Sequence, residues 1–226
     1  MSEYLLELKG VSKLMRGILV LKNVYVRIPA GRIIGVVGGN GLGKTTLLKV
    51  MAGIWKPDEG TVSRNVSPIP FVPSREEFYG WMKIKDAIWF FRTYYDSFCE
   101  EKAWRLLAGS GLSPEDKIST LSRGQQERLF LILTVSREAA LYLMDEPFSG
   151  MDAYFKKDVR QFLLQNLPEG SAVVIATHLL REMEQLFDEV IFVGAKSVRQ
   201  MEAEHIRQAY GKSIEQYYLE VIAHEK

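Results

Sequence analysis

The feature that most constrains this chain is a glycine-rich segment at residues 38–45, which fits the pattern GxxxxGK[ST]. The apolar run at 33–37 predicts a strand leading into it, and residues 45–51 have the composition of a helix. A strand, a glycine-rich loop and a helix N-terminus in this order gather backbone N–H groups around one anion. The sequence therefore predicts a nucleotide site in an α/β fold. The residues of this site are Gly38, Gly39, Asn40, Gly41, Leu42, Gly43, Lys44, Thr45 and Thr46.

Composition narrows the class of protein. The chain has 226 residues, of which 47% are hydrophobic, so we expect one compact unit over 1–226. Its 29 basic and 28 acidic residues give a net charge of +1, which offers no basic footprint for nucleic acid.

Cys99 has no cysteine partner for a disulfide or a zinc site, as in proteins of a reducing cytoplasm. Apolar runs such as 129–135 are far shorter than the roughly 18 residues of a membrane span, so a membrane role requires a partner.

The order of the predicted elements supports a parallel sheet. Short strands are expected at 4–8, 19–28 and 66–73, and a long helical region at about 75–135. Beyond it, strands at 141–144 and 173–177 alternate with a helix at 152–167, which is the βα order of a parallel sheet.

A second motif begins at Ser122. Ser122 and Gln125 form the pattern of a capping box, so Ser122 is expected to be the N-cap of a helix. The free N–H groups of such a helix start suit the terminal phosphate of a nucleotide. Ordinary helix capping is the alternative for this pattern taken alone.

Polar residues follow two of the predicted strands. Asp145 and Glu146 come after the strand at 141–144, and His178 ends the strand at 173–177. Ligands of open α/β sheets lie beyond the carboxyl ends of the strands, so all three are expected near the nucleotide. One acid can hold Mg²⁺ while the other polarises the attacking water. A solvated strand end is the alternative for the two acids.

These motifs, in this order, resemble the nucleotide-binding subunits of ABC (ATP-binding cassette) transporters over nearly the whole chain. The resemblance implies a P-loop NTPase with a RecA-like core, an antiparallel β subdomain and an α-helical subdomain. It further implies a head-to-tail dimer in which each ATP lies between the phosphate loop of one copy and the Ser122 peptide of the other. That peptide includes Gly124 and Gln125.

The resemblance also assigns roles to single residues. It implies that Glu146 is the general base, that Thr45 and Asp145 hold Mg²⁺, and that His178 senses the γ-phosphate. Asp152 is expected to communicate across the dimer.

Three positions depart from the family pattern. Arg123 replaces the first glycine of the signature peptide, and an outward side chain would be tolerated there. Ser74 stands where a glutamine is usual and is too short to span the same gap, so Glu76, Glu77 or a bridging water are alternatives. Met15 stands near the position of the aromatic that stacks on adenine, so Met15 is expected against the base, with Arg16 as an alternative.

The implied activity is ATP hydrolysis that powers separate integral membrane permease subunits from the cytoplasmic face of the membrane. Among such ATPases the chain is similar to those of small bacterial exporters of peptides or drug-like compounds, including the phenol-soluble modulin exporter. Import stays open because the permease decides direction, and a soluble ABC ATPase with an assembly role is the alternative class. Aromatic residues crowded between Phe78 and Phe98 suggest a docking surface for the permease beside a subdomain core.

Overall fold

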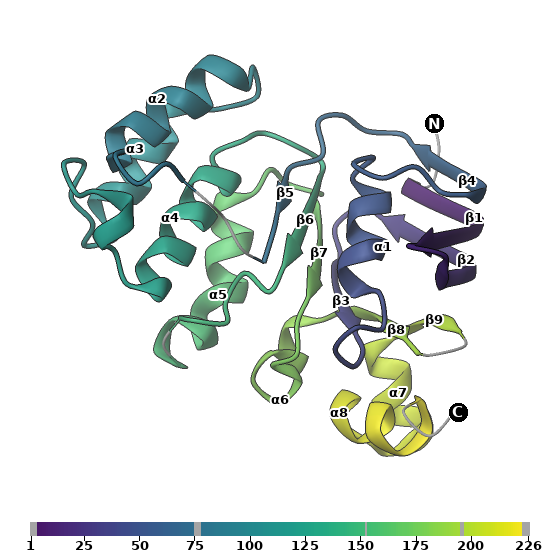
Figure 1. Cartoon of the computed structure of the whole chain (residues 1–226). Helices are drawn as coiled ribbons and strands as arrows, with labels where there is room; N and C mark the ends of the chain where they lie inside the picture. The colour runs from purple at the N-terminus through teal and green to yellow at the C-terminus, as the bar shows by residue number, and fades with distance from the viewer. Residues whose placement is uncertain (1–3, 75–77, 152, 195–196, 223–226) are drawn as a thin grey trace.

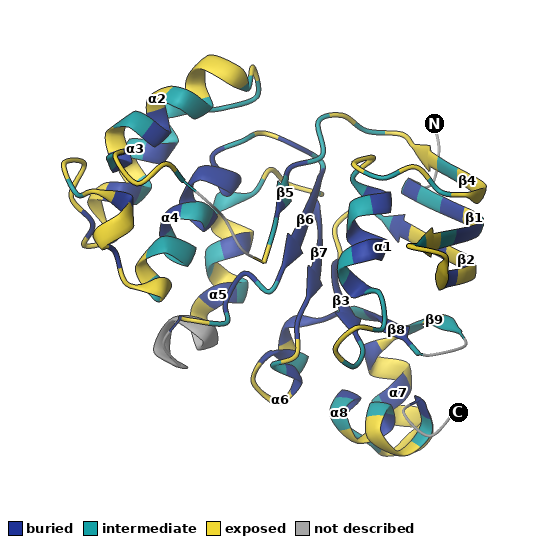
Figure 2. Ribbon diagram, in the orientation of Figure 1, coloured by how far each residue is buried: buried dark blue, intermediate teal, exposed yellow. Residues whose placement is uncertain are grey.

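A mostly parallel sheet forms the centre of the computed structural model, which describes residues 4–74, 78–151, 153–194 and 197–222. Its strand order is β5-β6-β7-β3-β8-β9, and only the edge strand β9 runs antiparallel. Every residue of β3, β6 and β7 is buried, as expected for parallel strands covered on both faces (Figure 2). The strands are β3 (Ile33–Val37), β5 (Phe71–Val72), β6 (Leu141–Asp145), β7 (Ala172–Ala176), β8 (Glu189–Val193) and β9 (Val198–Glu202).

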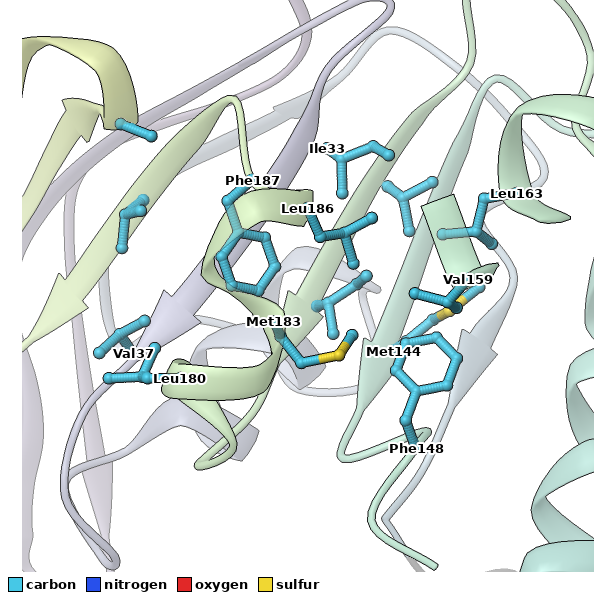
Figure 3. Close-up of a cluster of buried hydrophobic side chains, with 14 of the residues drawn as sticks. Ile33, Val37, Met144, Phe148, Val159, Leu163, Leu180, Met183, Leu186 and Phe187 are labelled. Atoms are coloured by element: carbon cyan, nitrogen blue, oxygen red, sulfur yellow. The ribbon is translucent and has the colours of Figure 1, made fainter. Parts of the chain in front are cut away.

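Alternate residues of β3 face two different cores. Ile33 and Val37 point into the first cluster of buried side chains, part of which is shown in Figure 3, whereas Ile34 and Val36 point into the second. The first cluster is completed by helices on one face of the sheet. These include α5 (Ala153–Asn166), α6 (Leu180–Met183), α7 (Ala203–Tyr210) and α8 (Ile214–Tyr217), with the short turns η2 (Glu184–Leu186) and η3 (Tyr218–Ile222).

An antiparallel sheet and one helix cover the other face. The second cluster lies between the parallel sheet, α1 (Lys44–Met51) and a three-stranded sheet of order β2-β1-β4. Its strands are β1 (Tyr4–Met15), β2 (Ile18–Pro29) and β4 (Glu59–Arg64). Because α1 is packed between two sheets, the N-terminus of this helix is fixed in position.

A group of helices on the far side of the parallel sheet from α1 has a core of its own (Figure 1). Leu107, Leu129 and Leu133 are among the buried residues of this third cluster. The outer faces of α2 and α3 are largely exposed (Figure 2). The elements are α2 (Ile84–Tyr94), α3 (Glu100–Ala108), η1 (Ile118–Thr120) and α4 (Arg123–Val135).

The predicted βα order is confirmed, with changes in the length of some strands. The strands expected at 4–8 and 19–28 are longer, because β1 and β2 pair with each other up to Met15 and Ile18. The strand expected at 66–73 was wrong for most of its length and forms only at Phe71–Val72. Pro68 and Pro70 lack an N–H group for strand pairing, which explains the loss. No helix among the described residues is long and apolar enough to cross a membrane.

Candidate nucleotide-binding site

The glycine-rich loop runs from the end of β3 to the start of α1 with its backbone packed against neighbouring strands. A Cβ atom at Gly38 would lie 2.5 Å from the carbonyl oxygen of Val193, and one at Gly43 would lie 2.7 Å from Val20. Gly43 also has a φ of 104°, which glycine adopts readily and other residues rarely do. The loop therefore needs glycine at both ends to reach its position beside the sheet.

Lys44 closes this loop from inside. Its ammonium group donates to the carbonyl oxygens of Gly38 at 2.8 Å and Gly39 at 3.3 Å. The residue is only 8% exposed, so its charge is held within the curve of the loop. Asn40 and Gly41 are exposed at the tip, so the loop opens to solvent on that side. A fixed cation next to free backbone N–H groups is suited to bind phosphate oxygens.

The next residue of α1 joins the loop to β6. The Thr45 hydroxyl donates to Oδ2 of Asp145 at 2.7 Å. Burial raises the pKa of the Asp145 carboxyl above its ordinary value, opposed by the Thr45 hydrogen bond and by the charge of Lys44. A buried carboxylate and a hydroxyl are oxygen ligands of the kind that Mg²⁺ prefers, and a divalent cation would stabilise the charged form of this acid. The two residues therefore fit a magnesium site.

Ser74 reaches this site directly. It follows β5, and a hydrogen bond from its side chain also lowers the pKa of Asp145. The sequence predicts that Ser74 is too short to span the gap to the metal, and its hydrogen bond to Asp145 is a contact that this prediction did not include. Glu76 and Glu77, the alternatives considered for this position, lie outside the described residues.

Glu146 and His178 meet at the same edge of the sheet. Nδ1 of His178 lies 2.8 Å from Oε2 of Glu146, and the backbone N–H of His178 donates to the same oxygen at 3.3 Å. Because a carboxylate only accepts, Nδ1 of the histidine carries the proton in this contact. Glu146 has a φ of 52°, a left-handed conformation that is costly for a residue other than glycine. Such strain is often found at reactive residues.

The predicted start of α4 is confirmed. Ser122 is its N-cap: the Ser122 hydroxyl accepts the N–H of Gln125 at 3.3 Å, and Oε1 of Gln125 accepts the N–H of Ser122 at 2.8 Å. Gly124 lies in this first turn. The side chain of Arg123 is 70% exposed but is not free, since it pairs with Glu127 at 3.1 Å.

The structure gathers the predicted residues into two separate groups. Lys44, Thr45, Asp145, Glu146 and His178 meet at the carboxyl edge of the parallel sheet. The capped start of α4 is not part of this group, because Figure 1 shows α4 and the loop before α1 on opposite sides of β6 and β7. One chain thus holds two candidate phosphate-binding groups, on opposite sides of these two strands (Figure 1).

The sequence analysis did not single out Tyr218, which lies beside the loop, or Trp55, which lies beside Met15. The hydroxyl of Tyr218 would lie 3.5 Å from a Cβ atom at Gly39, so this phenol packs against the phosphate loop. Met15 is partly buried at the end of β1 and lines a cavity of about 430 Å³ together with Trp55. Tyr218 carries no local signal in the sequence, since the fold alone brings it to the loop. Asp152 lies outside the described residues.

Comparison with known proteins identifies the family. The family model for ABC transporters matches residues 21–149, which include the glycine-rich loop, the Ser122 peptide and Glu146. The chain belongs to the ABC transporter family. This ABC protein is an ATPase, and it is an ATP-binding subunit of the kind found in transporters.

Named relatives of this ABC protein cover most of its length. It is 30% identical over 244 aligned residues to the uncharacterized ABC transporter ATP-binding protein YdbJ of Bacillus subtilis, over 100% of this chain and 77% of the relative. It is 29% identical to the zinc transport system ATP-binding protein TroB of Treponema pallidum, over 86% of this chain and 82% of the relative.

Solved structures confirm the predicted fold class of the ABC protein. The ATP-binding subunit of an ABC transporter matches it with a TM-score of 0.84 and 21% identity, over 96% of this chain and 98% of that one. The dimeric bacterial ABC transporter cassette MJ0796 matches with a TM-score of 0.75 and 22% identity, over 87% of this chain and 98% of that one.

Proposed function

We propose that this ATPase works as a head-to-tail pair of identical chains that powers export of a peptide or drug-like compound through a separate membrane permease. The observation that carries the pairing is the separation of α4 from the loop before α1 within one chain (Figure 1). Two chains related by a twofold axis can place the α4 start of each copy over the loop of the other, which completes two equal sites. The dimeric cassette among its structural relatives supports this arrangement.

ATP binding in one copy uses the loop and its lysine. Lys44 and the backbone N–H groups at the start of α1 hold the β- and γ-phosphates, and Met15 provides an apolar contact for the base. Thr45 and Asp145 hold Mg²⁺, which neutralises charge on the phosphates when it is bound. Ser122, Gly124 and Gln125 of the second copy close over the γ-phosphate.

Hydrolysis then depends on the acid at the end of β6. Glu146 takes a proton from a water molecule. The oxygen of that water attacks the γ-phosphorus as the bond from the γ-phosphorus to the leaving ADP oxygen breaks. His178 contacts this carboxylate through two N–H groups, so it is placed to hold Glu146 and to respond to a γ-phosphate nearby. Ser74 orients Asp145 through its hydroxyl.

Coupling to the permease uses the helical subdomain at about 75–135. Tyr79 and Trp81 precede α2 with 68% and 66% of their surface exposed, and their rings stack at 5.8 Å. Exposed aromatic pairs are typical anchors of protein interfaces. We infer that this surface binds the permease and keeps the ATPase at the cytoplasmic face of the membrane.

Glu146→Gln tests the proposed mechanism. The amide keeps the size of the side chain but cannot accept the proton, so turnover should fall by at least about 100-fold while ATP affinity is kept. The trapped ATP should hold the two chains together, and light scattering after size exclusion should show a dimer only with ATP. Glu101→Gln, on the exposed face of α3, is the control. Wild-type turnover in Glu146→Gln would refute the role of this acid.

A second measurement tests transport. The tagged ATPase, purified from detergent-solubilised membranes, should retain an integral membrane protein, and the pair rebuilt in vesicles should move cargo in an ATP-dependent way. Movement out of the compartment that holds the ATPase supports export. Movement into that compartment, or an ATPase that never associates with a membrane protein, would overturn the proposed direction or the proposed role.

A further inference from the structure

The first turn of α4 and the loop after Glu146 are joined by the side chain of Glu127. Its Oε2 accepts the N–H of Gly150 at 2.7 Å, and its Oε1 accepts the Ser149 hydroxyl at 2.9 Å. Nε of Arg123 donates to the same Oε1 at 3.1 Å, and the guanidinium also donates to the Ser149 hydroxyl. We call Arg123, Glu127, Ser149 and Gly150 the Glu127 clamp.

This clamp differs from an ordinary surface ion pair. The Glu127 side chain is only 15% exposed, so its carboxylate depends on these donors in place of water. A carboxylate that accepts both a backbone N–H and a guanidinium forms charge-assisted hydrogen bonds of defined geometry. An isolated exposed pair would contribute little and fix nothing.

Two glycines bring the backbones into contact at the clamp. A Cβ atom at Gly124 would lie 2.5 Å from the carbonyl oxygen of Gly150, and one at Gly150 would lie 2.9 Å from Cγ of Arg123. Any larger residue at either position would push the loop away from α4. The second glycine of the signature peptide therefore has a packing role within its own chain.

The loop is also anchored on its other side. Phe148 is 1% exposed and points into the first cluster beside Met144 (Figure 3), and Met151 is 5% exposed in the same cluster. The loop begins at Glu146, whose backbone is in the left-handed conformation. Held by the core on one side and by Glu127 on the other, the loop cannot shift without moving either α4 or Glu146.

We propose that Glu127 is a positioning residue that couples the two ATP sites of the dimer. Glu146 serves the ATP bound by its own chain, whereas Ser122 serves the ATP of the partner, and the clamp joins the two residues within one chain. Displacement of α4 at one site is thereby passed to the hydrolytic acid at the other. The inference rests on the proposed function, because it needs Ser122 to act across a dimer.

The first experiment separates positioning from binding. In Glu127→Ala, kcat should fall by about 10- to 100-fold, since a shift of about 1 Å in a reacting group can cost that much, while the KM for ATP stays within about threefold. Glu127→Gln keeps an oxygen for the N–H of Gly150 and should recover most of the rate. Glu101→Ala is the control for loss of an exposed acid on a helix.

A variant that keeps Glu127 guards against a folding defect. Ser149→Ala removes one donor from the clamp without removing charge, and melting temperatures show whether each variant is folded. We expect a fall in kcat of about 3- to 10-fold in Ser149→Ala, again with little change in KM. Unchanged kcat in both Glu127→Ala and Ser149→Ala would overturn the proposal.

Mixed dimers test the coupling itself. In the first, a Glu127→Ala chain is paired with a Glu146→Gln chain, so the one working site uses Glu146 from the chain with the broken clamp. In the second, a chain with both substitutions is paired with wild type, so the working site uses Ser122 from the chain with the broken clamp. Each dimer is isolated with two different tags, and a dimer of wild type with Glu146→Gln is the reference.

Both mixed dimers should turn over at least about tenfold more slowly than the reference, because the clamp holds both residues. If either one matched the reference, the clamp would serve one site only and the coupling would be refuted. A reference dimer or a wild-type protein without any turnover would instead refute the proposed function, so the two failures are distinguishable.

Discussion

The carboxyl edge of the sheet and the first turn of α4, the two groups proposed to bind phosphate, differ in how their residues are held in place. At the sheet edge, Lys44 and Asp145 are almost completely buried. Lys44 donates to carbonyl groups of its own loop, whereas Thr45, the partner of Asp145, lies 100 residues away along the chain. At α4, Ser122 is exposed, and its hydroxyl accepts the N–H of Gln125 in its own first turn. The acids thus reach the loop only through the tertiary fold, whereas the cap at Ser122 forms within its own helix turn.

This difference indicates which surface binds first. The sheet edge holds a fixed cation and a buried acid before any nucleotide binds. ATP binding there therefore requires little further loss of side-chain entropy. The start of α4 offers partial positive charge and a hydroxyl but no cage. ATP should therefore bind to the edge in a single chain, and the second chain should contribute mainly to turnover.

Among the variants that test this comparison, Lys44→Ala should cause the largest loss of ATP turnover. Loss of the only buried cation in the described part of the loop removes charge-assisted bonds to the phosphates, and we expect ATP turnover to fall by about 10³-fold with weakened binding. Lys49→Ala is the matched control, because Lys49 lies on the same helix but its ammonium is over the ring of Trp55. ATP binding by calorimetry and phosphate release measure both. Normal ATP binding in Lys44→Ala would show that the edge is not the primary site.

The same contrast explains what the sequence could predict. The loop at 38–45 and the Ser122–Gln125 cap are local patterns, and the acids at 145 and 146 follow from the rule for strand ends, so all of them could be read from the chain. The packing of Tyr218 against Gly39 and the hydrogen bond from the N–H of Gly150 to Glu127 could not be predicted, since they join distant segments through the tertiary fold. The reach of Ser74 to Asp145 depends likewise on strand order.

Ser122→Ala tests the other half of the comparison. ATP binding to a single chain should stay within about twofold, while turnover should fall by about tenfold as the hydroxyl contact is lost. The helix cap is lost as well, at a cost of about 1 kcal/mol in the free energy of unfolding. Binding to the isolated chain and steady-state turnover together measure the split.

Ser122→Asp separates the cap from the phosphate contact. Aspartate is as good an N-cap as serine, so the melting temperature should be kept, but its negative charge would face the γ-phosphate and should lower turnover further than Ser122→Ala does. Recovery of turnover in Ser122→Asp would mean that position 122 acts only as a cap.

The smallest effect on catalysis is expected for Tyr79→Ala combined with Trp81→Ala. Both side chains are mostly exposed and contact each other, so their loss should leave basal ATP turnover and the melting temperature nearly unchanged. Recovery of the permease that co-purifies with the wild type should fall by at least about tenfold, because aromatic anchors carry much of the free energy of binding at an interface. Tyr25→Ala removes an equally exposed tyrosine on β2 and should leave recovery intact. Full recovery of the permease with the double variant would show that the permease contacts another surface of the ATPase.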